Sequence, residues 1–72
     1  MGLFLYQVVR RHNGWAYRLE NTYSRIFTTQ WEAIEAAKVA AREMHEQGDY
    51  TQVRIKDGPF GWRTELVISG AH

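Results

Sequence analysis

The sequence predicts a two-layer α+β domain in which one helix packs on a mostly antiparallel sheet, in the order β-β-β-α-β-β. Three observations predict it: an Asn13-Gly14 hairpin signal, an Ala-rich helical segment over residues 29–47, and a second strand pair around Asp57-Gly58-Pro59. A chain of 72 residues forms one domain. Because so short a chain buries only about 60% of the surface that it exposes when unfolded, we expect a single thin core.

The first two strands are predicted over residues 5–11 and 15–20. Asn13-Gly14 between them suits a type I′ turn, because both central positions of that turn require positive φ. In the second strand Trp15, Tyr17 and Leu19 are expected to face the helix. They alternate with Ala16, Arg18 and Glu20, which are expected on the other face. A turn at 20–22 leads to a third strand over 23–28, whose periodicity leaves open which of its faces is buried.

The helix is predicted to begin at Thr29, because Thr29 and Glu32 have the spacing of a capping box. Gly48 supplies a stop after the last turn. Six residues form the apolar stripe at 3.6-residue spacing: Ala33, Ile34, Ala37, Ala40, Ala41 and Met44. A stripe made mainly of alanine allows the helix to lie close to the sheet.

Two further strands are predicted over residues 51–57 and 62–69. In the first, Val53 and Ile55 alternate with polar residues and are expected to face the helix. In the second, the residues expected to face the helix are Trp62, Thr64, Leu66 and Ile68. Residues 70–72 are expected to form a frayed tail.

The composition indicates a cytoplasmic protein with no membrane role. The chain has no cysteine, so neither disulfides nor thiolate-held metal stabilise it. Its apolar start at 3–6 has no preceding basic region and is too short for a signal peptide or a membrane span.

The sequence lacks the residue patterns of an enzyme, a metal site, a cofactor site or a site for a small-molecule substrate. His45-Glu46 begins the zinc motif H-E-x-x-H, but the second histidine would fall at Asp49. Ser24 and Ser69 lie in no nucleophile motif, and the loop at 58–61 contains a proline that removes an amide donor from any phosphate cradle. We therefore expect a non-enzymatic binding module.

Charge distribution suggests what that module binds. The net charge is +1, yet residues 29–47 hold two basic and four acidic residues, whereas the rest holds seven basic and four acidic residues. Basic residues thus concentrate in the strands, on positions expected to point away from the helix or to lie at the first hairpin. The predicted nucleic-acid-binding residues are Arg10, Arg11, Arg18, Arg54, Lys56 and Arg63.

Two alternatives fit the same residues. Exposed strand positions often carry arginine for solubility and cross-strand pairing, and Glu20 and Glu65 are available as partners. A protein partner or a second copy could instead pair with a sheet edge or with outward-facing Val9, Val39 or Val67. A dimerisation face is expected to be apolar at its centre, and this one is predicted to be basic.

A run of motifs gives the chain a recognisable pattern: Tyr6-Gln7-Val8, Gly14-Trp15-Ala16-Tyr17, Ser24, Thr29 to Ala37, Val53-Arg54-Ile55 and Gly61-Trp62-Arg63. This pattern, over roughly residues 6 to 65, resembles a family of small bacterial proteins that share a domain of unknown function. The resemblance implies the fold and little about function. The chain departs from the family in having Arg10-Arg11 where proline is common, and in its aromatic final hairpin.

A second resemblance is to the amino-terminal arm-binding domains of phage-type integrases, which dock a three-stranded sheet in a DNA groove. Gly14-Trp15, Phe27-Thr28-Thr29 and Glu32-Ala33 echo their motifs. The two strands predicted after the helix are not part of those domains, so this resemblance is an analogy of arrangement.

Overall fold

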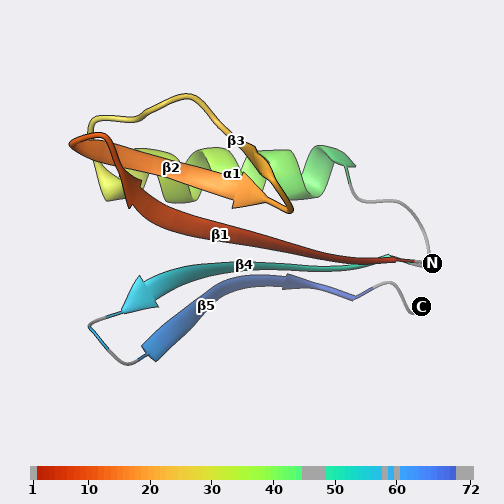
Figure 1. Cartoon of the computed structure of the whole chain (residues 1–72). Helices are drawn as coiled ribbons and strands as arrows, with labels where there is room; N and C mark the ends of the chain where they lie inside the picture. The colour runs from red at the N-terminus through yellow and green to blue at the C-terminus, as the bar shows by residue number, and fades with distance from the viewer. Residues whose placement is uncertain (1, 45–48, 58, 60, 70–72) are drawn as a thin grey trace.

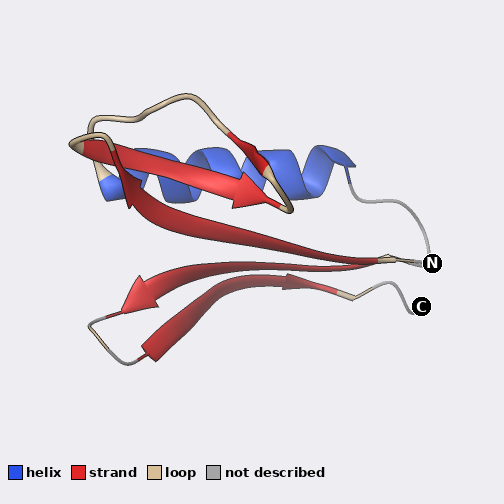
Figure 2. Cartoon of the chain, in the orientation of Figure 1, coloured by secondary structure: helices blue, strands red, loops and turns tan. Residues whose placement is uncertain are grey.

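The computed structural model describes residues 2–44, 49–57, 59 and 61–69. The elements are β1 (Leu3–Arg11), β2 (Gly14–Leu19), β3 (Thr22–Tyr23), α1 (Gln30–Met44), β4 (Tyr50–Asp57) and β5 (Gly61–Ile68). The strands form one sheet in the order β3-β2-β1-β4-β5, and the helix packs on one side of it, as Figure 1 and Figure 2 show. The predicted α+β class and element order are therefore confirmed.

The centre of the sheet is a parallel pair. β1 and β4 run in the same direction, whereas the other neighbouring strands are antiparallel. This arrangement follows from the chain path, because the helix carries the chain back along the sheet after the first three strands and delivers β4 beside β1 (Figure 1). The two hairpins, β1–β2 and β4–β5, consequently have their turns at the same end of the molecule.

The core lies between α1 and the middle of the sheet. The buried side chains that form it are Tyr6, Val8, Ala33, Ile34, Ala37, Ala41, Val53 and Ile55. The predicted helix stripe is confirmed at four positions, while Ala40 is half-buried and Met44, near the C-terminal end of α1, is exposed. The predicted helix residues 45–47 and the Gly48 stop lie outside the described residues.

The helix begins as the capping box predicts. The Glu32 amide donates to Thr29 Oγ1 at 3.1 Å, and the Thr29 amide donates to Glu32 Oε1 at 3.1 Å. These two bonds satisfy donors that the first turn of a helix would otherwise leave without partners.

The first hairpin turn lies one residue earlier than predicted. Its two loop residues are His12 and Asn13, with φ values of 50° and 64°, and the strands close on the pair Arg11 and Gly14. Asparagine and histidine enter the left-handed region more readily than most residues, so this pair fits a turn that requires positive φ. The prediction that Gly14 is a central turn residue is wrong, and its role is different.

Gly14 is required by close packing. A Cβ at this position would lie 2.6 Å from the Phe27 carbonyl oxygen and 2.5 Å from Ile26 Cγ2. That carbonyl accepts the Trp15 amide hydrogen at 2.9 Å, so the backbone of the loop before α1 is held directly against Gly14. Only glycine leaves room for this approach.

We expect Gly14→Ala to destabilise the domain by about 1–3 kcal/mol, because the added methyl group must push the 26–27 backbone away from β2. The measurement is the free energy of unfolding from urea denaturation. Asn13→Gly, one residue away, is the control and should change that free energy by less than about 0.5 kcal/mol, because glycine adopts positive φ freely. An alanine variant as stable as the parent would contradict this role for Gly14.

The third strand is shorter than predicted. Ladder pairing to β2 covers only Thr22 and Tyr23, with one further isolated bridge between Trp15 and Phe27. Ser24 interrupts the ladder, because its hydroxyl oxygen accepts the Tyr17 amide hydrogen at 3.0 Å in place of a backbone carbonyl. The sequence left open which residues of this segment face inward, and the structure shows that Phe27 packs against the core.

An irregularity in β5 reverses the predicted faces of half of that strand. Val53 pairs with Leu66, but the next residue, Arg54, pairs with Thr64, so Glu65 is an extra residue in the ladder. Such a bulge shifts the alternation by one position. Leu66 and Ile68 pack against the core as predicted, whereas Thr64 and Trp62 lie on the opposite side of the sheet.

Candidate nucleic-acid interface

The candidate site is the side of the sheet that α1 leaves uncovered, called the open face below. Partners in the strand register share a face, so one row across it contains Tyr23, Arg18, Gln7, Arg54 and Thr64. Lys56 and Trp62 form the next open-face pair between β4 and β5. Arg11 lies two residues after Val9 at the end of β1, so its side chain is on the same face as those of Gln7 and Val9. Register thus brings four basic side chains from three strands onto one surface.

Three of the four cations of this face lie near aromatic rings. The Arg11 guanidinium carbon is 3.7 Å from the centroid of the Tyr23 ring. Arg54 and Lys56 both approach Trp62, with their charged groups 5.6 Å and 5.5 Å from the ring centroid. Contacts of this kind orient a cation without neutralising it.

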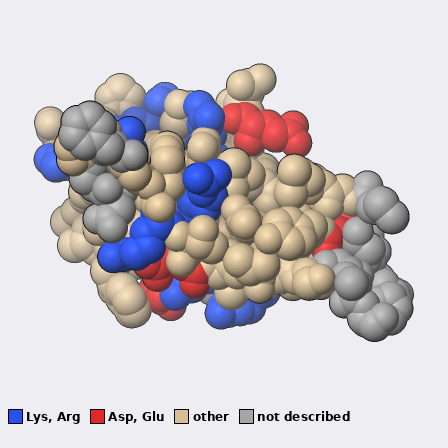
Figure 3. All heavy atoms as spheres, turned by 90° about the horizontal axis from the view of Figure 1, so that it is seen from below, with Lys and Arg blue, Asp and Glu red and all other residues tan. Residues whose placement is uncertain are grey.

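The four cations of the open face form no ion pair within the described part of the chain. Of the described carboxylates, none lies within 4.0 Å of a charged nitrogen of Arg11, Arg18, Arg54 or Lys56. Figure 3, which views the molecule from below, shows Lys and Arg mainly over its left half, with Asp and Glu next to several of them. A surface with unneutralised positive charge attracts polyanions.

Arg18 is held in place at the centre of the row. Its Nη2 donates to Gln7 Oε1 at 2.7 Å, and its Nε is enclosed without a hydrogen-bond partner in the described part of the chain. The side chain is half-buried. Arg18 therefore carries a positioned charge at the centre of the row.

Arg63 does not belong to this face, and its predicted position is wrong. The register pairs it with Ile55 on the helix side, and its Nε donates to Glu65 Oε2 at 2.7 Å. Glu65 also lies 3.8 Å from Lys38 Nζ on α1. The β5 bulge is the physical reason, because it moves Arg63 to the side on which the helix lies. Arg63 therefore pairs with Glu65 of its own strand, the residue named as a possible ion-pair partner in the alternative interpretation.

Arg10 is also on the helix side by register, paired with Trp15, but it lies at the end of the sheet. The parallel pairing of β1 with β4 stops at Val8 and Ile55, and beyond it the two hairpins diverge (Figure 1). A hollow of about 340 Å³ lies between them, called the notch below. The described residues that line the notch are Val9, Arg10, Trp15, Lys56 and Trp62.

Comparison with known proteins identifies the family. The model of DUF2188, described as an uncharacterized protein conserved in bacteria, matches residues 6–66. The chain belongs to this family. The match confirms the resemblance found in the sequence and extends over β1 to most of β5. No curated protein and no solved structure is significantly similar to the chain.

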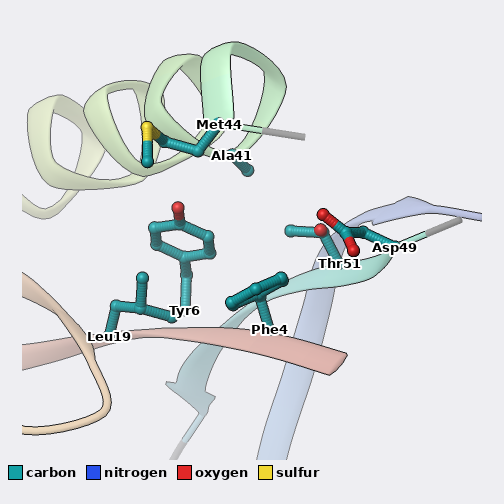
Figure 4. Close-up of a pocket in the computed structure, with 7 residues that line it drawn as sticks. All are labelled: Phe4, Tyr6, Leu19, Ala41, Met44, Asp49 and Thr51. Atoms are coloured by element: carbon teal, nitrogen blue, oxygen red, sulfur yellow. The ribbon is translucent and has the colours of Figure 1, made fainter. Parts of the chain in front are cut away.

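In this DUF2188 domain, a cavity smaller than the notch lies near the C-terminal end of α1. It measures about 120 Å³, and its lining residues are Phe4, Tyr6, Leu19, Ala41, Met44, Asp49 and Thr51. Figure 4 shows the Tyr6 hydroxyl pointing toward the helix. Burial raises the pKa of the Tyr6 phenol, and the neighbouring Tyr17 raises it further. The volume of this cavity is below the range of about 300–1,000 Å³ that is usual for ligand pockets.

Metal-binding side chains do not cluster in the described part of this DUF2188 domain. No group of three or more His, Asp or Glu residues there could hold a metal ion. The one described histidine, His12, is exposed in the first turn, and His45 and His72 lie outside the described residues. No described helix has the length and apolar character needed to cross a membrane.

The sequence missed the aromatic component of the open face. Trp62 was expected in the core and is 39% exposed beside Arg54 and Lys56. One signal was present: the same predicted inward set includes the polar residue Thr64, which suits an open face better than a core. That mismatch is typical of a strand that contains a bulge.

Proposed function

We propose that this domain is a non-enzymatic nucleic-acid-binding module that contacts phosphates through its open face. The observation that carries the proposal is the set of four cations, Arg11, Arg18, Arg54 and Lys56, on one surface with no described carboxylate paired to them. Guanidinium groups bind phosphate oxygens with two parallel hydrogen bonds, so three arginines suit a phosphate backbone. Such a role belongs in the cytoplasm, the compartment that the sequence predicts.

An amide NMR titration tests the proposal. The labelled protein is titrated with short duplex DNA, single-stranded DNA and single-stranded RNA at low and at raised salt. We expect shifts on the open-face strands and a slope of log K against log salt of about −3, since each of four phosphate contacts with a single strand contributes about −0.7. The absence of shifts with all three polymers at low salt would overturn the proposed function.

Self-association is a second candidate, favoured by the other end of the same face. There Leu3, Tyr50 and Val67 are 73%, 38% and 49% exposed, and Leu3 pairs with Tyr50 in the register. Exposed apolar residues grouped on a sheet often mark a protein interface. The valines singled out in the sequence do not form one surface, because Val39 is on the helix and Val9 lines the notch.

Sedimentation velocity distinguishes the two candidates. A sedimentation coefficient that rises with protein concentration, and no longer does so in Leu3→Asp, would favour a dimer through the apolar end. A monomer at all concentrations would exclude self-association and would favour nucleic acid as the partner of the open face.

A further inference from the structure

We infer that the notch between the two hairpins binds an unpaired nucleobase, so that the domain prefers single-stranded nucleic acid to duplex. This inference rests on the proposed function and specifies the polymer. It comes from the meeting of two tryptophans, Trp15 and Trp62, with the cations Arg10 and Lys56 in one hollow.

The composition of the notch fits a nucleobase. Two indole rings and the Val9 side chain provide apolar surface, and none of the described lining residues is acidic. Proteins that bind single strands combine aromatic rings that stack on bases with basic side chains that follow the backbone. The volume of about 340 Å³ is in the range of small-ligand pockets.

The arrangement of charge favours a base in the notch and phosphates beside it. Lys56 and Arg54 flank Trp62 on the open face, while Arg10 lies 5.5 Å from the Trp15 ring centroid on the other side of the notch. A strand whose base enters the notch thus has cations within reach of the phosphates on both sides. Beyond the notch, the row of Arg54, Gln7 and Arg18 crosses the open face.

A base-paired nucleotide cannot use this site. The notch is a hollow between two hairpin ends, and the base faces of a duplex are stacked inside the helix. Duplex DNA could therefore contact the cations of the open face but would gain nothing from Trp15 and Trp62. Single strands gain both contributions, which is the physical basis of the preference.

The first test removes the base and leaves the phosphates. Fluorescence anisotropy measures binding of the full chain to oligo(dT), oligo(U) and an abasic oligonucleotide, each of about 12 nucleotides. We expect both base-containing strands to bind more tightly than the abasic strand and than duplex DNA of equal length. A ratio of oligo(U) to oligo(dT) affinity far from one would identify RNA or DNA as the preferred strand.

The second test removes the stacking ring. Trp62→Ala should weaken binding of oligo(dT) or oligo(U) by about 5- to 150-fold, the loss expected for one stacked base, and should leave abasic binding unchanged. Trp62→Tyr should restore most of the affinity, because tyrosine also stacks. Trp31→Ala is the matched control: Trp31 is 67% exposed on α1 and is not among the described residues that line the notch, so its loss should not alter binding.

The outcomes separate the inference from the proposed function. If the parent binds abasic and base-containing strands equally, or if Trp62→Ala binds both as the parent does while thermal melting shows it folded, the inference is overturned and phosphate binding stands. If the parent binds none of the polymers, the proposed function fails and the inference fails with it.

Discussion

Reversing the charge of Arg54 and Lys56 together, as Arg54→Glu and Lys56→Glu, is expected to abolish nucleic-acid binding and to leave the domain folded. The two residues project from β4 onto the open face, and their charged groups lie 5.6 Å and 5.5 Å from the Trp62 ring centroid. The double variant converts two attractive contacts into two repulsive ones at the centre of the phosphate path. Since each lost contact also removes counterion release, affinity should fall by about 100-fold or more at low salt.

The fold should tolerate this change. Neither side chain forms an ion pair with a described carboxylate, and exposed cation–aromatic contacts contribute only about 0.5–1 kcal/mol each. We therefore expect the free energy of unfolding to fall by about 1–2 kcal/mol and the melting temperature by about 4–16 °C, a loss that leaves the protein folded at the temperature of the binding assay.

The matched control makes the same change of charge away from the open face. Arg42 is exposed on α1 and Arg63 is on the helix side of β5, so Arg42→Glu with Arg63→Glu alters net charge equally. This control should reduce affinity only slightly, through the overall field of the protein. Equal losses in the two double variants would show that binding depends on net charge and not on the open face. The control also tests the corrected position of Arg63.

The features that the sequence predicted correctly depend on local patterns. The alternation of Val53 and Ile55 places both in the core, and the spacing of Thr29 and Glu32 places the start of the helix. These signals involve residues a few positions apart, which obey fixed periods. The same alternation explains why Arg18, Arg54 and Lys56 lie opposite the helix as predicted.

The features that the sequence did not predict depend on contacts between distant segments. The extra residue at Glu65 becomes visible only when β5 is aligned with β4, and it exchanges the faces of Trp62 and Arg63. In the same way, the notch exists because β1 and β4 stop pairing at Val8 and Ile55. Periodicity within one strand carries no information about where two strands part. The sequence therefore identifies Trp15 and Trp62 as aromatic residues of two strands but does not predict that they line one hollow.

Ile55→Ala is expected to have the largest effect on stability. Ile55 is 1% exposed and belongs to the core cluster between α1 and the sheet. Truncating a buried isoleucine to alanine costs about 2–5 kcal/mol, because apolar contacts are lost and a cavity remains. For a chain of 72 residues, total stability is expected to be about 4–11 kcal/mol. The variant should therefore lose a large fraction of its stability, measured by urea denaturation.

Ile26→Ala provides the same chemical change at a site that is 39% exposed, and it should cost about 1 kcal/mol or less. Similar losses in the two variants would contradict the position of Ile55 in the core.

Ile55→Ala also separates stability from binding, because Ile55 lies between Arg54 and Lys56 on β4. Since alternate residues of a strand point to opposite faces, Ile55→Ala should keep its affinity for nucleic acid under conditions where it remains folded. Neighbouring positions on one strand would then control stability and binding separately.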